Sequence, residues 1–303
     1  HRFQSDWKIG FDKDGHIEAY TVIFNADAGY ASDLTMAILE RAMLHAENAY
    51  YIPNVRIIGN TWKTNLPSNV AFRGFGQPQG MAVIENAIDA MARFLKKDPN
   101  EIRRLNFYGI NDRNTAPYGA LIPENRLNIV YEKIIHSSEY LSRKKTVDEF
   151  NAGHRDIKRG IALTPVKFGI SFTTAFLNQA GALIHIYSDG TVQVNHGGIE
   201  MGQGLNLKML QVASAELGVS VDRIKITPTN TSKIPNTSAT AASSGSDLNG
   251  MAVKNAVDQL KSRIKSIAPE ILMEMFPDKK VLSENITIEN DSVFLSNNFV
   301  SSV

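Results

Sequence analysis

Three loops of small residues, each followed directly by a helical pattern, constrain the fold of this chain more than any other feature. They span residues 71–80, 197–204 and 237–246. Small residues let the backbone turn sharply and present N–H groups at the start of a helix, where the helix dipole favours an anion. One such loop is weak evidence because similar strings arise by chance. Three in one chain predict a ligand held by backbone donors from several sides.

The loop at 71–80 leaves two interpretations open when it is taken alone. Its glycines surround Phe72, Arg73 and Phe75, which offer stacking faces and a fixed charge to a ligand. The same composition also suits a strand-to-helix turn that places both phenylalanines in the core. Composition does not decide between a ligand loop and a structural turn.

Periodic patterns along the chain predict a mixture of hairpins and helices. Alternation of apolar and polar residues predicts β-hairpins at 7–24 and 181–196, a strand at 53–63, another at 221–226, and a last hairpin at 291–298. Helical spacing predicts helices over 33–44, 80–97, 102–108, 127–150, 207–217 and 251–264, whereas 25–32 is predicted to be a loop. These patterns predict an α+β protein, with a boundary between residues 110 and 160.

Composition bounds the class of protein. The chain has 303 residues, 43% apolar side chains and a net charge of +1, which favours two domains and argues against a nucleic-acid partner. Its apolar stretches are too short for a membrane span, so we expect a soluble, cytoplasmic protein. It contains no cysteine, which excludes disulfides and cysteine-ligated iron–sulfur clusters from this chain. Because the chain opens on His1 and closes within a predicted hairpin, we expect a fragment.

Other arrangements of reactive side chains are less well supported. His185 and His196 lack a third ligand at metal spacing, which favours structural roles. Glu200 lies among glycines, where it suits either a general base or a carboxylate at a helix start. The chain contains no G-x-S-x-G or Walker motif, so serine hydrolase and P-loop chemistry are unsupported.

Four motifs in collinear order, which together span most of the chain, closely resemble the molybdenum-binding region of xanthine dehydrogenases and aldehyde oxidases. They are Ala71-Phe72-Arg73-Gly74-Phe75-Gly76-Gln77-Pro78-Gln79, Lys167-Phe168-Gly169-Ile170-Ser171-Phe172-Thr173, His196-Gly197-Gly198-Ile199-Glu200-Met201-Gly202-Gln203-Gly204, and Pro235-Asn236-Thr237-Ser238-Ala239-Thr240-Ala241-Ala242-Ser243.

The resemblance implies an α+β fold of two subdomains of mixed sheets with packed helices. Residues 1–115 and 161–303 would be parts of the first and second molybdenum-cofactor-binding subdomains, and residues 116–160 a helical connection. It implies a molybdenum hydroxylase whose molybdopterin cofactor, with oxo and sulfido ligands on molybdenum, hydroxylates hypoxanthine and xanthine to urate with oxygen from water. Iron–sulfur clusters and FAD would lie in other domains or subunits of a homodimeric enzyme.

The resemblance also assigns roles to individual residues. The backbone amides of Arg73 and Ala242 would lie beside the molybdenum. The pterin would be held by Met201, Gly202, Gln203, Thr240, Ala241, Ala242 and Ser243. The substrate ring would stack on Phe75 and Phe172, with Thr173 as a hydrogen-bonding neighbour. Arg41 would be the catalytic arginine that contacts the substrate carbonyl and stabilises negative charge in the transition state.

Two departures from the family pattern qualify this assignment. Gln77 stands where xanthine dehydrogenases mostly have glycine. The general-base glutamate has no counterpart here, and for this reason we expect the chain alone to be inactive. Arg41, Phe172 and Thr173 favour the purine-oxidising branch. The alternatives are an aldehyde oxidase-type hydroxylase and a non-catalytic scaffold derived from the same fold.

Overall fold

A computed structural model describes residues 1–231, 237–278, 280–295 and 298–302 of the chain. Pro235, Asn236 and Asn297, which belong to the sequence motifs above, lie outside the described residues. The chain forms two compact units that divide between Gly169 and Ile170. Residues 116–160 thus lie in the first unit, and the division into cofactor-binding subdomains stays a prediction.

Unit 1 is built on a three-stranded sheet of β1 (Phe3–Phe11), β2 (Ile17–Gly29) and β3 (Asn54–Lys63). β1 and β2 are antiparallel, which confirms the predicted hairpin, whereas β3 runs parallel to β2. The predicted loop at 25–32 is wrong over its first five residues, which continue β2. Alternation persists there in small residues, because Ala26 and Ala28 are buried while Asn25 and Asp27 are not.

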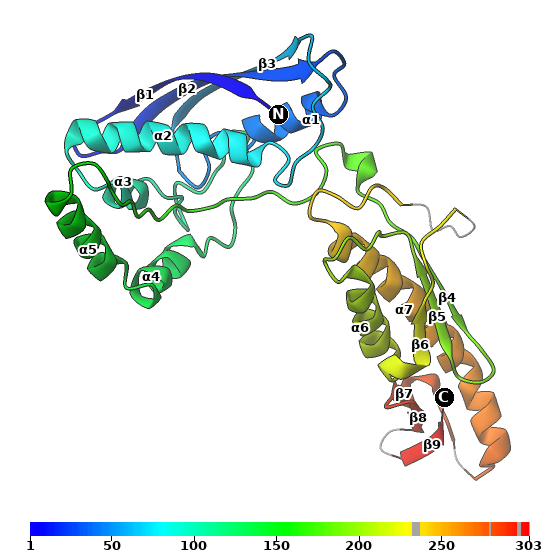
Figure 1. Ribbon diagram of the computed structural model, residues 1–303. Coiled ribbons are helices and arrows are strands. Elements are labelled where there is room, and N and C mark those ends of the chain that lie inside the picture. Colours follow the sequence, from blue (N-terminus) through cyan, green and yellow to red (C-terminus); the bar gives the residue numbers. More distant parts are fainter. Residues whose placement is uncertain (232–236, 279, 296–297, 303) are drawn as a thin grey trace. The chain divides into compact units, whose positions relative to one another are not determined.

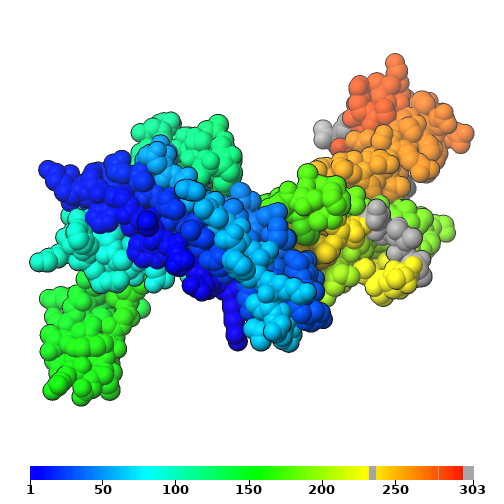
Figure 2. Space-filling model, turned by 90° about the horizontal axis from the view of Figure 1, so that it is seen from above, coloured from blue at the N-terminus to red at the C-terminus, as the bar shows by residue number. Residues whose placement is uncertain are grey.

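α1 (Thr35–Met43) and α2 (Gln77–Leu95) cover one face of this sheet (Figure 1). α3 (Pro99–Leu105) packs against α2, and α4 (Leu127–Ser137) and α5 (Tyr140–Gly153) pack against each other. The main core of the unit joins α1 and α2 to the strands, with Phe24, Leu39 and Ile88 among its buried members. Figure 2 shows α5 in green, projecting from the blue and cyan part of the same unit.

Four helix predictions need correction. The helices predicted over 102–108 and 251–264 span Pro99–Leu105 and Gly245–Met275. The helix predicted from Gly80 begins at Gln77, because Pro78 suits a first helical turn and Gly76 takes up the left-handed conformation at the N-cap, with φ of 104°. The helix predicted over 127–150 is two helices, because Glu139 has a positive φ of 51° between them.

The start of α2 packs directly against the backbone of α1. A Cβ atom on Gly76 would overlap the Ile38 carbonyl group, and one on Gly80 would overlap the Ala42 carbonyl. Only glycine fits such a backbone contact. The glycines that the sequence suggested for a ligand therefore bring the loop at 71–76 next to the helix that carries Arg41.

Unit 2 contains two further small sheets. β4 (Ala182–Ile186) and β5 (Val192–His196) form the predicted hairpin, and β6 (Ile224–Ile226) pairs parallel to β5. They pack with α6 (Leu205–Leu217) and α7 (Gly245–Met275) around a second core (Figure 1). The remaining elements are η1 (Ala175–Leu177), η2 (Val221–Arg223), η3 (Ser283–Asn285), β7 (Ile286–Glu289), β8 (Ser292–Leu295) and β9 (Asn298–Ser302). Both units thus confirm the predicted α+β class.

Within the described part of the chain, no helix has the length and apolar character that a bilayer crossing requires.

We expect replacement of Gly76 by alanine to destabilise the chain by roughly 2–4 kcal/mol, because an added methyl group overlaps α1 and φ must stay positive. Urea unfolding followed by circular dichroism measures the change. Gly153→Ala is the matched control, since a Cβ atom there meets nothing within 4 Å and its backbone φ is not in the left-handed region. Equal effects of the two substitutions would contradict the proposed backbone contact.

Candidate functional site

Arg41 lies near the end of α1 with only 5% of its surface exposed. Its guanidinium donates a hydrogen bond to the carbonyl of Gly169, and its Cζ atom lies 5.6 Å from the centre of the Phe168 ring. Burial lowers the pKa of Arg41, but arginine starts from so high a value that it remains charged. A buried, permanent positive charge is therefore held against the segment that precedes Phe172.

The loop at 71–76 carries the other predicted residues of unit 1. Phe75 is half-buried with φ of 52°, and its N–H donates to the Phe72 carbonyl at 2.8 Å. Phe72 is 76% exposed and Arg73 is also exposed, so the alternative of a turn with both phenylalanines in the core is not what forms. Gln77 is buried in the first turn of α2, where its side-chain amide contacts the sulfur of Met81.

A row of buried polar residues after α1 was not recognised from the sequence. His45, Glu47 and Asn48 all bind residues 165–169, which we call the strap. His45 Nε2 accepts the Gly169 N–H at 3.0 Å, and Glu47 pairs with the Lys167 ammonium group. Asn48 donates to the Pro165 carbonyl at 2.9 Å and accepts the Lys167 N–H at 3.1 Å. The only signal in the sequence was that three of the four residues at 45–48 are polar, directly after the apolar stripe of α1 ends.

The hydrogen bonds assign the protonation state of His45. Its Nδ1 atom lies 2.7 Å from the Arg41 carbonyl, which can only accept, while Nε2 faces the Gly169 N–H, which can only donate. The imidazole is therefore neutral, with its proton on Nδ1. Burial, with further contributions from Lys167 and Arg41, lowers the pKa of His45 from 6.5 to about 4. Burial also raises the pKa of Glu47, against the opposing effect of Lys167.

The predicted substrate residues of unit 2 follow the strap directly. Phe172 is half-buried, and its backbone is held on both sides by the Asn178 amide, which accepts from the Phe172 N–H at 2.8 Å and donates to its carbonyl at 3.0 Å. Thr173 is exposed. Asn178 is a second supporting residue that the sequence did not reveal, because nothing in its neighbourhood distinguishes it from a loop asparagine.

Hydrogen bonds join the predicted elements of unit 2 into one cluster. The Ile199 N–H donates to Thr240 Oγ1 at 2.8 Å, and the Ser171 N–H donates to the Ala242 carbonyl at 2.8 Å. The structure therefore brings together the segment with Phe172 and Thr173, the loop with Met201, Gly202 and Gln203, and the loop with Thr240, Ala241, Ala242 and Ser243.

Backbone strain occurs within the predicted motifs as well as elsewhere. Four of the eleven non-glycine residues with positive φ in the described part of the chain lie in these motifs, namely Phe75, Ser171, Ala242 and Ser243. Non-glycine residues in this region cost of order 1–3 kcal/mol each and cluster at functional sites. Ala242 and Ser243 are consecutive, and successive residues in turn conformations direct their N–H groups to one side, as in anion-binding nests.

The side chain of Glu200 binds several of the backbone N–H groups of its own loop. Its carboxylate accepts N–H groups from Gly202 at 2.9 Å, Gly204 at 3.0 Å and Asn206 at 3.0 Å. The hydrogen bond from the Asn206 amide is the largest cause that lowers the pKa of Glu200, and those from Gly204 and Gly202 add to it. Of the two roles left open by the sequence, this geometry supports the carboxylate at a helix start, before α6.

The two histidines of the β4–β5 hairpin have different surroundings. His196 is buried, accepts the Gly198 N–H at 3.2 Å and lies 3.1 Å from Asn206 Oδ1, whereas His185 is exposed. The described ranges contain no group of three or more histidine, cysteine, aspartate or glutamate side chains arranged to hold a metal ion.

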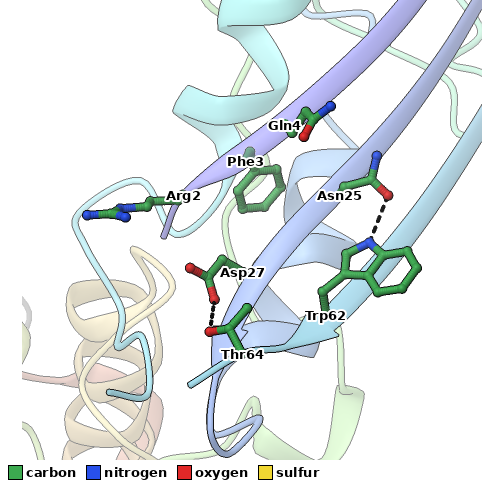
Figure 3. Close-up of a pocket in the computed structure, with 7 residues that line it drawn as sticks. All are labelled: Arg2, Phe3, Gln4, Asn25, Asp27, Trp62 and Thr64. Atoms are coloured by element: carbon green, nitrogen blue, oxygen red, sulfur yellow. Dashed lines mark hydrogen bonds between the residues drawn. The ribbon is translucent and has the colours of Figure 1, made fainter. Parts of the chain in front are cut away.

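A separate cavity of about 530 Å³ lies on the outer face of the unit 1 sheet (Figure 3). Trp62 forms one wall, fixed by its hydrogen bond to Asn25 Oδ1 at 2.9 Å, and Thr64 donates to Asp27 at 2.8 Å. Its lining includes none of the residues assigned by the resemblance.

Comparison with known families decides the relationship of the chain. Residues 133–298, more than half of the chain, match a family described as a molybdopterin cofactor-binding domain, and residues 1–107 match a second family with the same description. The chain belongs to the molybdopterin cofactor-binding domain family.

Individual proteins agree with this membership. A xanthine dehydrogenase from Dictyostelium discoideum is 46% identical over 88% of this chain and 20% of the relative. A nicotinate hydroxylase from Emericella nidulans is 47% identical over the same shares. The chain thus spans about a fifth of the length of these relatives. The crystal structure of quinoline 2-oxidoreductase from Pseudomonas putida 86 has the same fold, with a TM-score of 0.82 at 22% identity over 98% of this chain and 38% of that one.

The residues present fit the molybdopterin group that defines this family. Asn249 is 3% exposed, and its Oδ1 atom is buried with no hydrogen-bond partner among the described residues. It lies beneath Gly198, where a Cβ atom would come within 2.9 Å of Asn249 Nδ2. The loop at Gly198 over this unsatisfied buried amide oxygen offers polar groups suited to such a cofactor, and the strained turn at Ala242 and Ser243 adds backbone N–H groups.

The neutral state of His45 predicts a pH dependence of stability. Because the folded pKa of about 4 lies below the unfolded value of 6.5, the unfolded state binds more protons between these values. The free energy of unfolding should therefore fall as pH falls from 6.5 to 4, by at most roughly 3 kcal/mol at 1.36 kcal/mol per pKa unit. Urea unfolding at each pH measures this. The difference between wild type and His45→Gln isolates the effect, and parallel curves for the two proteins would refute it.

The role of Glu200 predicts a local effect. In Glu200→Ala, the amides of Gly202, Gly204 and Asn206 lose their acceptor, so their hydrogen exchange should accelerate about tenfold or more. Mass spectrometry of peptides covering 199–207 measures this. Glu289→Ala, an exposed glutamate on β7, is the matched control. Unchanged exchange in Glu200→Ala would show that the carboxylate does not order the loop.

Proposed function

We propose that this chain is part of the molybdenum-binding catalytic region of a xanthine dehydrogenase, which hydroxylates hypoxanthine and xanthine to urate. The observation that carries the proposal is the cluster in unit 2, where hydrogen bonds from Ser171 and Ile199 tie three separate motifs together. Membership of the molybdopterin cofactor-binding domain family and the similarity to xanthine dehydrogenases support it.

The cofactor would be held mainly by backbone groups. Met201, Gly202, Gln203 and the turn at 240–243 would hold the pterin, and the amides of Arg73 and Ala242 would contact the metal centre. When bound, the molybdenum cofactor supplies two-electron oxidation together with transfer of a water-derived oxygen to the substrate. The protein's contribution is position: strained, hydrogen-bonded loops present donors without reorganising.

The substrate would be held by two aromatic rings, a hydroxyl group and one guanidinium group. Phe75 and Phe172 offer aromatic rings for stacking on a heterocycle, and Thr173 offers a hydroxyl. Arg41 binds the substrate carbonyl, where negative charge grows during attack on the ring. A buried guanidinium is well suited to this task, because low local dielectric strengthens its attraction for developing charge.

The rest of the reaction belongs to other parts of the enzyme. The general-base glutamate required by the resemblance has no counterpart in this chain, so the chain by itself would lack acceleration of order 10²-fold or more. Iron–sulfur and FAD domains or subunits would remove the electrons. Homodimerisation and a cytoplasmic location belong to the same proposal.

A second candidate is a hydroxylase for another heterocycle or an aldehyde. Identity does not choose between substrates, because a nicotinate hydroxylase and a xanthine dehydrogenase are 47% and 46% identical to the chain. We favour purines because Arg41 and Thr173 match the positions that recognise a carbonyl-bearing ring in the purine-oxidising branch. A non-catalytic scaffold would need neither residue.

The test uses the complete protein that contains this chain. We expect it to contain molybdenum and to reduce a dye with xanthine faster than with nicotinate or an aromatic aldehyde. Arg41→Ala should lower kcat/KM for xanthine by about 10²- to 10³-fold, the usual effect of removing a donor to developing negative charge. Phe75→Ala should also lower it, through lost stacking.

Arg93→Ala is the control, because Arg93 is exposed on α2. Molybdenum content measured in each variant separates lost catalysis from lost cofactor. A competent enzyme without molybdenum would refute the proposal, and full activity of Arg41→Ala and Phe75→Ala would support the scaffold.

A further inference from the structure

Arg41, Gly169 and His45 form a closed cycle of hydrogen bonds within unit 1. The Arg41 guanidinium donates to the Gly169 carbonyl, and the Gly169 N–H donates to His45 Nε2 at 3.0 Å. His45 Nδ1–H donates back to the Arg41 carbonyl at 2.7 Å. Each residue both donates and accepts, so loss of one bond leaves a polar group of the buried Arg41 or His45 without that partner.

Aromatic contact reinforces the cycle. The Phe168 ring lies 5.6 Å from the Arg41 Cζ atom and 5.5 Å from the centre of the His45 imidazole, tilted by 36°. The guanidinium therefore has a ring beside it as well as a carbonyl at one end. These contacts leave it little freedom to take up another rotamer.

His45 is the member of the cycle whose side chain bonds two backbone groups, one at the end of α1 and one in the strap. It follows the last turn of α1, four residues after Arg41, and caps a carbonyl that the helix end would leave without an intrahelical partner. Its second nitrogen binds the strap at Gly169, three residues before Phe172. One neutral imidazole thus orders both Arg41 and the strap that leads to Phe172.

The charges around the imidazole favour this use. Arg41 and Lys167 are the cations that face the imidazole, and Glu47 pairs with Lys167. In the described part of the chain, neither ring nitrogen is hydrogen-bonded to a carboxylate. These charges favour the neutral imidazole. Only a neutral imidazole can accept the Gly169 N–H while it donates to the Arg41 carbonyl.

We infer that His45 is a positioning residue of the proposed hydroxylase, which fixes the guanidinium of Arg41 without touching the substrate, because it holds the strap whose Gly169 carbonyl accepts from Arg41. This inference rests on the proposed function, because Arg41 contacts the substrate only in that proposal. A small displacement of a catalytic group lowers rates by up to about 10²-fold.

The experiment compares substrates in the complete enzyme, with each rate normalised to molybdenum content. His45→Ala should lower kcat/KM for xanthine by about 10- to 100-fold. Unsubstituted purine has no carbonyl for Arg41, so its kcat/KM should fall by about threefold or less. His45→Gln should recover part of the xanthine activity, because its amide oxygen can reach toward the Gly169 N–H as Nε2 does. His185→Gln, an exposed histidine on β4, is the matched control.

A double-mutant cycle tests whether His45 acts through Arg41. In an Arg41→Ala background, His45→Ala should change kcat/KM for xanthine by less than about twofold, because the group it positions is gone. Equal losses with xanthine and purine, or a persistent loss in the Arg41→Ala background, would overturn the inference. So would wild-type activity of His45→Ala in an enzyme that oxidises xanthine, and the proposed function would then stand. A wild-type protein without xanthine turnover would overturn both.

Discussion

The backbone contact between α1 and the first turn of α2 is the constraint on which the rest of unit 1 depends. Gly76 and Gly80 allow it, because any side chain at these positions would overlap the carbonyl groups of Ile38 and Ala42. The contact places the loop with Arg73 and Phe75 beside α1, which carries Arg41 in its last turn. The following turn is then in place for His45, Glu47 and Asn48 to receive the strap at 165–169. Residues distant in sequence share one corner because two helices approach more closely than side chains would permit.

The polar residues buried at this corner orient the neighbouring segments more than they stabilise the fold. Asn48 and Tyr50 donate to Glu85 at 2.9 and 2.6 Å, and Arg103 donates to Glu85 and Asp89, each at 2.8 Å. Replacing buried ionic groups by apolar ones is often neutral or stabilising, so such groups are weak evidence for stability. Apolar side chains would, however, tolerate sliding of the strap, whereas donors and acceptors accept only one register. We therefore interpret the network that joins α2, α3 and the strap as a set of contacts that fixes the register of the strap.

Most secondary-structure elements could be predicted from local periodicity in the sequence. Most of the supporting residues that were not predicted act through contacts with residues far along the chain. The β1–β2 hairpin, the β4–β5 hairpin and the helices follow from alternation and helical spacing, which are properties of neighbouring residues. The error at residues 25–29 arose because small residues can form strand as well as loop, and tertiary pairing with β3 decided for strand. His45 and Asn48 could not be found, because their partners Gly169 and Lys167 lie more than a hundred residues further along the chain. Asn178 lies only six residues from its partner Phe172, but nothing in the sequence distinguishes it from an ordinary loop asparagine. The motif loops were recognisable by resemblance, whereas the residues that support them were not.

Glu200 and the strained turn at Ala242 and Ser243 are two parts of one physical strategy. A loop rich in glycine loses much conformational entropy when it orders around a ligand, which weakens binding. The Glu200 carboxylate orders the loop at 200–206 beforehand through three N–H groups, and Thr240 ties the loop at its other end through the Ile199 N–H. The turn at Ala242 and Ser243 stores strain that its neighbours must hold in place, and Ser171 contributes by binding the Ala242 carbonyl. The protein's own anion thus occupies some of the donors, and in the proposed function the strained turn is the part of the cluster that would receive the cofactor.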